Sequence, residues 1–158
     1  MALFNIAEVV DMGIEKEKRR RDFYGLVAER FQDKEMKDLF MKLKGWEQTH
    51  IDKFSEIRES VLQAEATEKY PGELKAYMDA VINDKLYKDV SPDSFSQRVT
   101  SPLEAIEIGI TFEKDAIVFF NGVLPYTVGG NKQVIQDIID EERQHIIYLT
   151  QLKQKYGK

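Results

Sequence analysis

Apolar residues recur at every third or fourth position in four long stretches of the chain. The stretches are 6–30, 34–63, 102–123 and 132–155. This spacing places the apolar residues on one face of an α-helix, whereas a half-buried strand would show strict alternation. Only short turns separate the first stretch from the second and the third from the fourth, so each pair is expected to pack antiparallel. The pattern therefore predicts an all-α four-helix bundle.

Residues suited to cap helices stand at the start of each predicted helix. Asn5 and Ser101 are each followed three positions later by a glutamate, which is the pattern of a capping box. Asp33 precedes the second helix, and Asn131 precedes the fourth. Each of these side chains is expected to accept a hydrogen bond from a free backbone N–H of the first turn.

Residues 65–100 do not continue the strong helical pattern. A weaker pattern within them predicts a short helix over 73–88, since a connection this long normally has structure of its own. We interpret the segment as a crossover that carries the chain back to the starting end of the bundle. The chain is then a single domain, 1–158, in which the crossover joins the helix pairs 5–64 and 101–156.

The first and third predicted helices resemble each other in sequence. An alignment of 5–28 with 101–124 brings residues of the same type together: Glu8 and Glu104, Gly13 and Gly109, Ile14 and Ile110, Glu17 and Glu113, Lys18 and Lys114, Phe23 and Phe119, and Val27 and Val123. One helix-turn-helix unit is therefore predicted to occur twice. Gly13 and Gly109 are expected to mark positions of close helix packing.

Both histidines of the chain follow a glutamate by three positions. The two units are Glu47 with His50 and Glu142 with His145, and they fall in the second and fourth predicted helices. Residues three apart share one face of a helix, so each unit directs a carboxylate and an imidazole toward one point. Such a pair of side chains is suited to binding a metal ion.

The other two predicted helices each carry a glutamate within their apolar face, Glu17 in the first and Glu113 in the third. Four carboxylates in one core cannot all stay ionised and unpaired, because each buried ion costs on the order of several kcal/mol. Two divalent cations would neutralise them. A lone Glu from each of two helices and a Glu-x-x-His unit from each of the others is the ligand arrangement of di-iron bundles. Without thiolates, these ligands suit iron or manganese, and zinc can compete.

Other polar residues near these six receive simpler interpretations. Tyr24 is expected either to be an ordinary core aromatic or to donate a hydrogen bond to a ligand carboxylate. The basic run 16–21 is interpreted as a solvated helix face. Glu141 and its neighbour Asp140 lie at the edge of the apolar stripe and are also expected to be solvated.

Composition limits which binding partners and which kinds of chemistry are expected for this protein. The chain has 158 residues and a net charge of −5, with a pI near 5.2, which argues against nucleic acid as a partner. No apolar run approaches the roughly 18 residues of a membrane helix. The N-terminus lacks the basic segment of a secretory signal, so a cytoplasmic location is expected. There are no cysteines, so electrons must come from another protein or a reducing substrate.

On these residues the chain resembles the ferritin-like superfamily and, within it, the di-iron domain of rubrerythrin-like proteins. The resemblance rests on one motif in each helix: Glu17 with Phe23-Tyr24, Glu47-x-x-His50, Glu113 with Phe119-Phe120, and Glu142-x-x-His145. It implies that all six Glu and His residues of these motifs bind two irons, with Glu47 and Glu142 bridging them. Glu17 and His50 would complete one iron site, and Glu113 and His145 the other.

The resemblance also implies an activity, in which hydrogen peroxide or dioxygen oxidises the ferrous pair and a separate protein donates electrons. A homodimer is expected on the same ground. Rubrerythrins proper carry a rubredoxin domain with four cysteines, which this sequence lacks. They also have an extra carboxylate three residues from the ligand of the third helix, whereas Ile110 and Ala116 stand at those spacings here. The expected ligand set is therefore the symmetric one of four Glu and two His.

Three functions remain open at this point. The first is a di-iron oxidoreductase acting on peroxide or dioxygen. The second is ferritin-like iron handling, in which ferroxidation precedes storage or delivery. The third is a non-enzymatic helical bundle whose polar core residues pair with one another.

Overall fold

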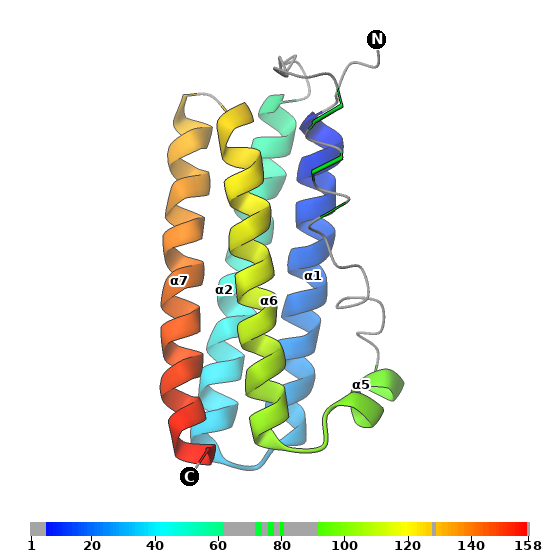
Figure 1. The fold of residues 1–158 in the computed structure, drawn as a ribbon, viewed down its shortest axis with the longest axis vertical. Coiled ribbons are helices and arrows are strands. Elements are labelled where there is room, and N and C mark those ends of the chain that lie inside the picture. Colours follow the sequence, from blue (N-terminus) through cyan, green and yellow to red (C-terminus); the bar gives the residue numbers. More distant parts are fainter. Residues whose placement is uncertain are drawn as a thin grey trace.

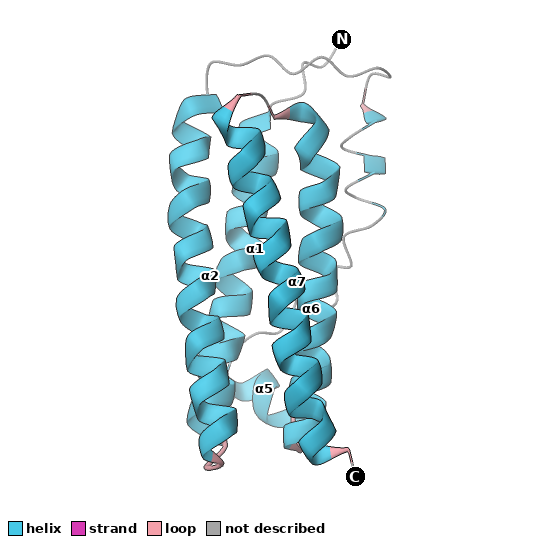
Figure 2. Ribbon diagram, turned by 90° about the vertical axis from the view of Figure 1, so that its left-hand side faces the viewer, coloured by secondary structure: helices cyan, strands magenta, loops and turns pink. Residues whose placement is uncertain are grey.

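The structure is a computed structural model that describes residues 6–61, 72–73, 76–77, 80, 92–127 and 129–157. Four long helices lie side by side along one axis (Figure 1): α1 (Ile6–Arg30), α2 (Lys34–Val61), α6 (Pro102–Val123) and α7 (Gly130–Tyr156). A short helix, α5 (Pro92–Arg98), lies beside one end of the bundle, and a 3₁₀ turn, η1 (Leu124–Tyr126), follows α6. Every regular element among the described residues is helical (Figure 2), so the predicted all-α bundle is confirmed.

The direction of the helices corrects one expectation about the crossover. Helices α1 and α2 form one antiparallel hairpin, and α6 and α7 form the other (Figure 1). Helix α2 ends at the end of the bundle where α1 begins. Helix α6 begins where α1 ends, and not at the starting end as expected. The short helix predicted over 73–88 falls mostly outside the described residues.

Two of the predicted N-caps are present. The backbone N–H of Glu104 donates to Ser101 Oγ over 3.2 Å at the start of α6. Asp33 Oδ1 accepts a hydrogen bond of 3.1 Å from the backbone N–H of Met36 at the start of α2. The Glu104 carboxylate accepts from the backbone N–H of Thr100 rather than from that of the cap residue. Both helices thus begin where their side-chain acceptors predict.

The cap predicted for the last helix is wrong. Helix α7 begins at Gly130, one residue before Asn131, and its N-cap is Gly129 with a φ of 61°. A positive φ of this size is readily adopted by glycine, so the backbone turns there without a side-chain cap. Asn131 consequently lies inside the first turn. The cap predicted at Asn5 lies outside the described residues.

The apolar core has two parts along the bundle axis, which we call the upper and lower cores. The upper core comprises Ala7, Val9, Val10, Ile14, Ile51, Phe54, Ile57, Ala116, Phe119, Phe120, Val123, Ile135, Ile138 and Ile139. The lower core comprises Phe23, Tyr24, Val27, Ala28, Met36, Phe40, Leu43, Phe95, Val99, Ala105, Ile106, Phe112, Leu149 and Leu152. Along every long helix, the glutamates and histidines of the predicted site fall between these two groups.

Helices α1 and α6 approach each other closely next to this polar layer. A Cβ atom added to Gly13 would lie 2.8 Å from Phe119 Cε1, which is closer than carbon atoms pack. At Gly109 the same atom would lie 3.4 Å from Leu149 Cδ1 and 3.5 Å from Tyr24 Cε1. The expectation that the repeated glycines mark close packing is confirmed, with Gly13 the tighter of the two.

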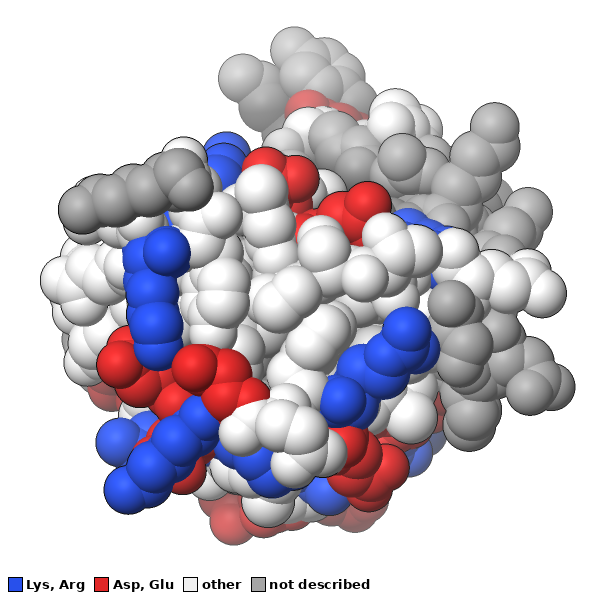
Figure 3. All heavy atoms as spheres, turned by 90° about the horizontal axis from the view of Figure 1, so that it is seen from below, with Lys and Arg blue, Asp and Glu red and all other residues white. Residues whose placement is uncertain are grey.

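Charged side chains of both signs lie beside one another at the end of the bundle where α1 meets α2 (Figure 3). There Lys155 pairs with Asp33 at 3.1 Å and with Glu35 at 3.3 Å, which ties α7 to the start of α2. Among the described helices, none has the length and apolar character needed to cross a membrane.

Candidate metal centre

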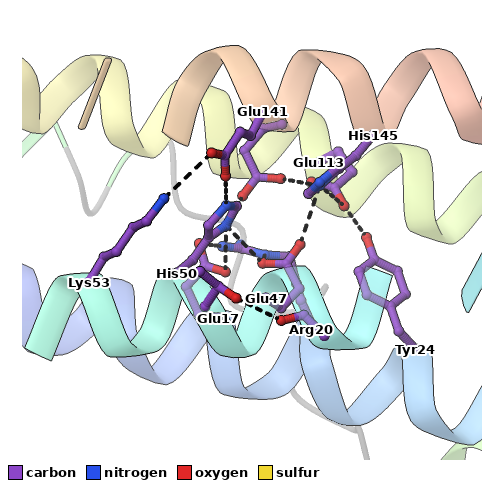
Figure 4. Close-up of polar contacts among 12 residues, drawn as sticks. Glu17, Arg20, Tyr24, Glu47, His50, Lys53, Glu113, Glu141 and His145 are labelled. Carbon is purple, nitrogen blue, oxygen red and sulfur yellow. Dashed lines mark hydrogen bonds and ion pairs between the residues drawn. The ribbon is translucent and has the colours of Figure 1, made fainter. Parts of the chain in front are cut away.

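Six buried side chains from the four long helices meet between the upper and lower cores (Figure 4): Glu17 from α1, Glu47 and His50 from α2, Glu113 from α6, and Glu142 and His145 from α7. They form two overlapping groups. One group is Glu17, Glu47, His50 and Glu142, and the other is Glu47, Glu113, Glu142 and His145. Within each group, candidate ligand atoms from all four residues lie within 4.8 Å of one another. The structure thus brings together all six residues that the sequence singled out.

Glu47 and Glu142, the two residues shared by both groups, lie between the two histidines. The two oxygens of Glu142 each lie 3.0 Å from a different imidazole, Oε1 from His50 Nδ1 and Oε2 from His145 Nδ1. The oxygens of Glu47 divide in the same way, at 3.5 Å from His50 Nδ1 and 3.8 Å from His145 Nδ1. Each of these carboxylates can therefore offer one oxygen to each half of the centre.

Glu17 and Glu113 each belong to one half only. Glu17 Oε2 lies 3.8 Å from His50 Nδ1, and Glu113 Oε1 lies 3.5 Å from His145 Nδ1. Both imidazoles point the same nitrogen, Nδ1, into the cluster. The result is two half-sites, each with one histidine, one glutamate of its own and a share in two common carboxylates.

Several carboxylate oxygens in the cluster leave their hydrogen-bonding capacity unused. Among the described residues, neither oxygen of Glu47 accepts a hydrogen bond of ordinary geometry, and the same holds for Oε2 of Glu17 and of Glu113. A buried polar atom without a partner costs about 1–3 kcal/mol. Two bound divalent cations would satisfy these oxygens, so the six residues fit a pair of metal ions.

Without metal, protons on two of the four carboxyls and on the imidazoles offset the negative charge of the cluster. Burial, together with the charge of Glu142, raises the pKa of Glu113 to about 8 and that of Glu47 well above its usual range. Although burial opposes a charged imidazole, contacts with Glu113 and Glu142 raise the pKa of His145 to about 9. Metal binding would displace these protons, because ligands must be deprotonated to coordinate.

Arg20 is a site residue that the sequence analysis missed. The basic run 16–21 was expected to be a solvated face, but Arg20 is 1% exposed and Lys16 is 7% exposed, so this expectation is wrong for these two residues. Arg20 Nη2 donates to Glu17 Oε1 in a short charged hydrogen bond, and its Nε lies 3.9 Å from Glu47 Oε2. Burial opposes ionisation of Glu17, yet the guanidinium keeps the pKa of that carboxyl below its usual value. The sequence held one indication of this contact: Arg20 follows Glu17 by three residues, so the two side chains share one face of the helix.

Glu141 was also misjudged. Its side chain is 44% exposed, but its Oε2 lies 2.6 Å from His50 Nε2, and its Oε1 lies 3.5 Å from Lys53 Nζ (Figure 4). A carboxylate on the outer nitrogen of an imidazole sets the orientation of the ring and raises its basicity as a ligand. Glu141 therefore holds His50 with Nδ1 facing the cluster.

Tyr24, for which the sequence left two interpretations open, contacts the cluster directly. Its hydroxyl donates a hydrogen bond of 2.6 Å to Glu113 Oε1 and lies 3.4 Å from the carbonyl oxygen of Gly109. The residue is fully buried. Burial and the nearby charge of Glu113 raise the pKa of Tyr24 well above its usual value, so the hydroxyl keeps its proton.

A surface cavity of about 330 Å³ reaches the edge of the cluster between α2 and α7. Its lining includes Trp46, Glu141, His145 and Tyr148. Trp46 stacks on His145, with ring centroids 4.8 Å apart, and on Tyr148, with centroids 5.7 Å apart. A small molecule in this cavity would lie against His145 of the centre and against Glu141, which contacts His50.

Comparison with known proteins identifies the fold. A scan of protein-family models and a search of curated proteins found no match. Among solved structures, the chain is similar to a crystal structure of a Thermotoga maritima protein for which a ferritin-like diiron-carboxylate assignment has been proposed. The TM-score is 0.69, the sequence identity is 18%, and the likeness covers 99% of both chains.

The helices and the buried cluster define a four-helix bundle with a carboxylate and imidazole centre suited to metal ions. The backbone likeness shows that this bundle has the ferritin-like fold. The fold expected from the sequence is therefore confirmed over essentially the whole chain.

Proposed function

We propose that the protein is a rubrerythrin-like di-iron carboxylate oxidoreductase that reduces hydrogen peroxide or dioxygen. The observation that carries the proposal is the pair of overlapping four-residue groups that share Glu47 and Glu142. Two ions bound at such groups would share two carboxylates and could therefore act together. The description of the Thermotoga maritima protein with the same fold as a diiron-carboxylate protein supports this assignment.

In this proposal each residue of the cluster has a defined task. His50 and Glu17 would hold one ion, His145 and Glu113 would hold the other, and both ions would draw on Glu47 and Glu142. A bound ferrous pair would supply the two electrons that, with two protons, convert one hydrogen peroxide molecule to two water molecules. Tyr24 fixes Glu113 through its hydroxyl, and Glu141 fixes His50. The upper and lower cores keep bulk water from both ends of the cluster.

The remaining components come from outside the cluster. The cavity beside His145 is a route by which peroxide or dioxygen can reach the centre. Because the chain has no cysteine, electrons would return from a separate donor protein. A cytoplasmic homodimer remains the expected form of the protein.

Metal content is the first test of this proposal. Protein purified without added metal or chelator is expected to carry nearly two irons per chain. The Glu47→Ala and His145→Ala variants should lose most of this iron, while Gly45→Ala, at an exposed position, should retain it. The reduced protein should then be oxidised rapidly by peroxide in a stopped-flow experiment. Iron that is bound but inert to peroxide and dioxygen would contradict the oxidoreductase. No bound metal, with stability indifferent to iron, manganese and zinc, would favour the non-enzymatic bundle.

Iron handling is the second candidate, because the ferritin-like fold is shown directly. Ferroxidation followed by storage requires a hollow shell of many subunits. Sedimentation velocity distinguishes the two proposals, since a dimer or monomer excludes a shell and leaves the oxidoreductase or a delivery role.

A further inference from the structure

The two halves of the candidate metal centre differ in charge at one pair of equivalent positions. The sequence repeat aligns Glu17 of α1 with Glu113 of α6, and it aligns Arg20, three residues after Glu17, with Ala116. Both Arg20 and Ala116 are buried. One half-site therefore contains a guanidinium where its counterpart contains a methyl group.

Glu17 and Glu113, which each belong to one half-site only, have correspondingly different hydrogen-bond partners. Glu17 accepts a charged hydrogen bond from Arg20, whose Nε also lies 3.9 Å from Glu47 Oε2. Glu113 instead accepts a hydrogen bond of 2.6 Å from the neutral hydroxyl of Tyr24. In the repeat, Phe120 occupies the position equivalent to Tyr24. Figure 4 shows Arg20 beside Glu17 and Tyr24 beside Glu113.

These contacts have opposite consequences for a divalent cation. A guanidinium does not lose its proton in proteins, so its positive charge stays in the half-site whatever binds there. That charge repels a nearby metal ion, and it competes with the ion for the Glu17 carboxylate. A tyrosine hydroxyl does neither, because it carries no charge and donates its proton to Glu113 as a neutral group.

We propose that Arg20 makes the two metal positions unequal, so that the Glu113 and His145 position fills first. The Glu17 and His50 position then binds its ion at least about tenfold more weakly, which makes this ion the exchangeable one. The inference deepens the proposed function and rests on metal binding at this cluster. Arg20 would thus influence metal affinity although it is not one of the six candidate ligands.

The two histidines of the chain allow each position to be followed separately. His50 belongs only to the Glu17 half and His145 only to the Glu113 half. Zinc is a suitable probe, since it is diamagnetic and binds imidazole and carboxylate ligands. In a zinc titration of ¹⁵N-labelled, chelator-treated protein, the side-chain resonances of His145 should shift with the first equivalent and those of His50 with the second. A competing chelator gives the two dissociation constants.

Parallel shifts of both histidines, or His50 shifting first, would overturn the inference while leaving the metal centre intact. No shift of either histidine would overturn the metal centre and the inference with it.

Variants at position 20 then test the cause. Arg20→Met removes the charge but fills similar space, and it should bring the two dissociation constants to within a few-fold of each other. Arg20→Lys keeps a positive charge and should retain the order of filling. A gap between the constants that persists in Arg20→Met would show that the guanidinium is not its source.

Discussion

The indole of Trp46 lies nearly parallel to the imidazole of His145, with ring centroids 4.8 Å apart and an angle of 11° between the planes. Trp46 is the only tryptophan in the chain, so its fluorescence reports on a residue of the proposed centre. Binding of Co²⁺ to the chelator-treated protein is expected to quench most of this emission. The paramagnetic ion would bind His145, and the ring of His145 stacks directly on the indole of Trp46. A fluorescence titration measures the effect.

Zinc provides the matched control for this quenching, since it occupies the same ligands without unpaired electrons and should change the emission far less. His145→Ala should abolish the Co²⁺ effect at low metal concentration. Quenching that survives in His145→Ala would place the ion elsewhere on the protein.

Replacing Tyr24 with phenylalanine tests the hydrogen bond to Glu113. The change removes only the hydroxyl and leaves a buried carboxyl oxygen without its donor. The free energy of unfolding of the chelator-treated protein should fall by about 1–3 kcal/mol, as measured by urea denaturation. Tyr148→Phe, at a position 39% exposed, should change it by less than about 0.5 kcal/mol. Equal effects of the two variants would mean that the Tyr24 hydroxyl has no special role.

Glu141 and Asp140 are adjacent acidic residues with different partners, which makes them a matched pair. Glu141 contacts His50, whereas Asp140 pairs with the exposed Arg143. Glu141→Gln should weaken metal binding by about 10–100-fold, because His50 loses the carboxylate that orients it. Asp140→Asn should leave the affinity unchanged. Calorimetric titration with zinc measures both, and an equal loss in the two variants would point to net charge rather than ring orientation.

Alanine at two helical glycines should have opposite effects on stability. Gly13→Ala would force a methyl group against Phe119 in the packed upper core and should cost about 1–3 kcal/mol. At Gly45 nothing lies within 4 Å of an added Cβ, so Gly45→Ala should stabilise α2 by up to about 1 kcal/mol. Thermal or urea unfolding shows the signs, and a stabilising Gly13→Ala would contradict the close approach of α1 and α6.

Asp33 should contribute to the acid sensitivity of the protein. The backbone N–H of Met36 and, less strongly, the side chain of Lys155 lower the pKa of Asp33 from 3.8 to about 2. Because the pKa is depressed in the folded state, the stabilisation is present above the unfolded value and is lost as the pH falls from about 4 to 2. Asp33→Asn keeps a good cap without the charge. Wild type should unfold at a higher temperature than Asp33→Asn above this window and at nearly the same temperature below it.

The six candidate ligands could be found in the sequence because helical geometry alone decides which residues share a face. A spacing of three places Glu47 beside His50 whatever surrounds the helix, and an apolar stripe around Glu17 or Glu113 predicts an inward carboxylate. The Ser101 and Asp33 caps follow from equally local rules.

Arg20 and Glu141 could not be assigned in this way, because their roles depend on partners beyond their own local pattern. A long charged side chain at the edge of a stripe can reach solvent or the core, and the choice depends on what the facing helices offer. Arg20 turns inward because Glu17 and Glu47 meet there, and Glu141 acquires its task from a histidine on α2. The direction of the crossover likewise depends on how the two hairpins associate.

The ion pair between Arg20 and Glu17 also bears on how such a protein matures in a cell. Together with the two imidazoles whose Nδ1 atoms lie 3.0 Å from Glu142, it offsets negative charge inside the bundle without a metal ion. If the cluster binds metal as proposed, the chain would not need the ions in order to balance this charge as it folds, and the cavity beside His145 would lie next to one of their ligands. Folding and metal binding would then be separate steps, and the order of the two would be free.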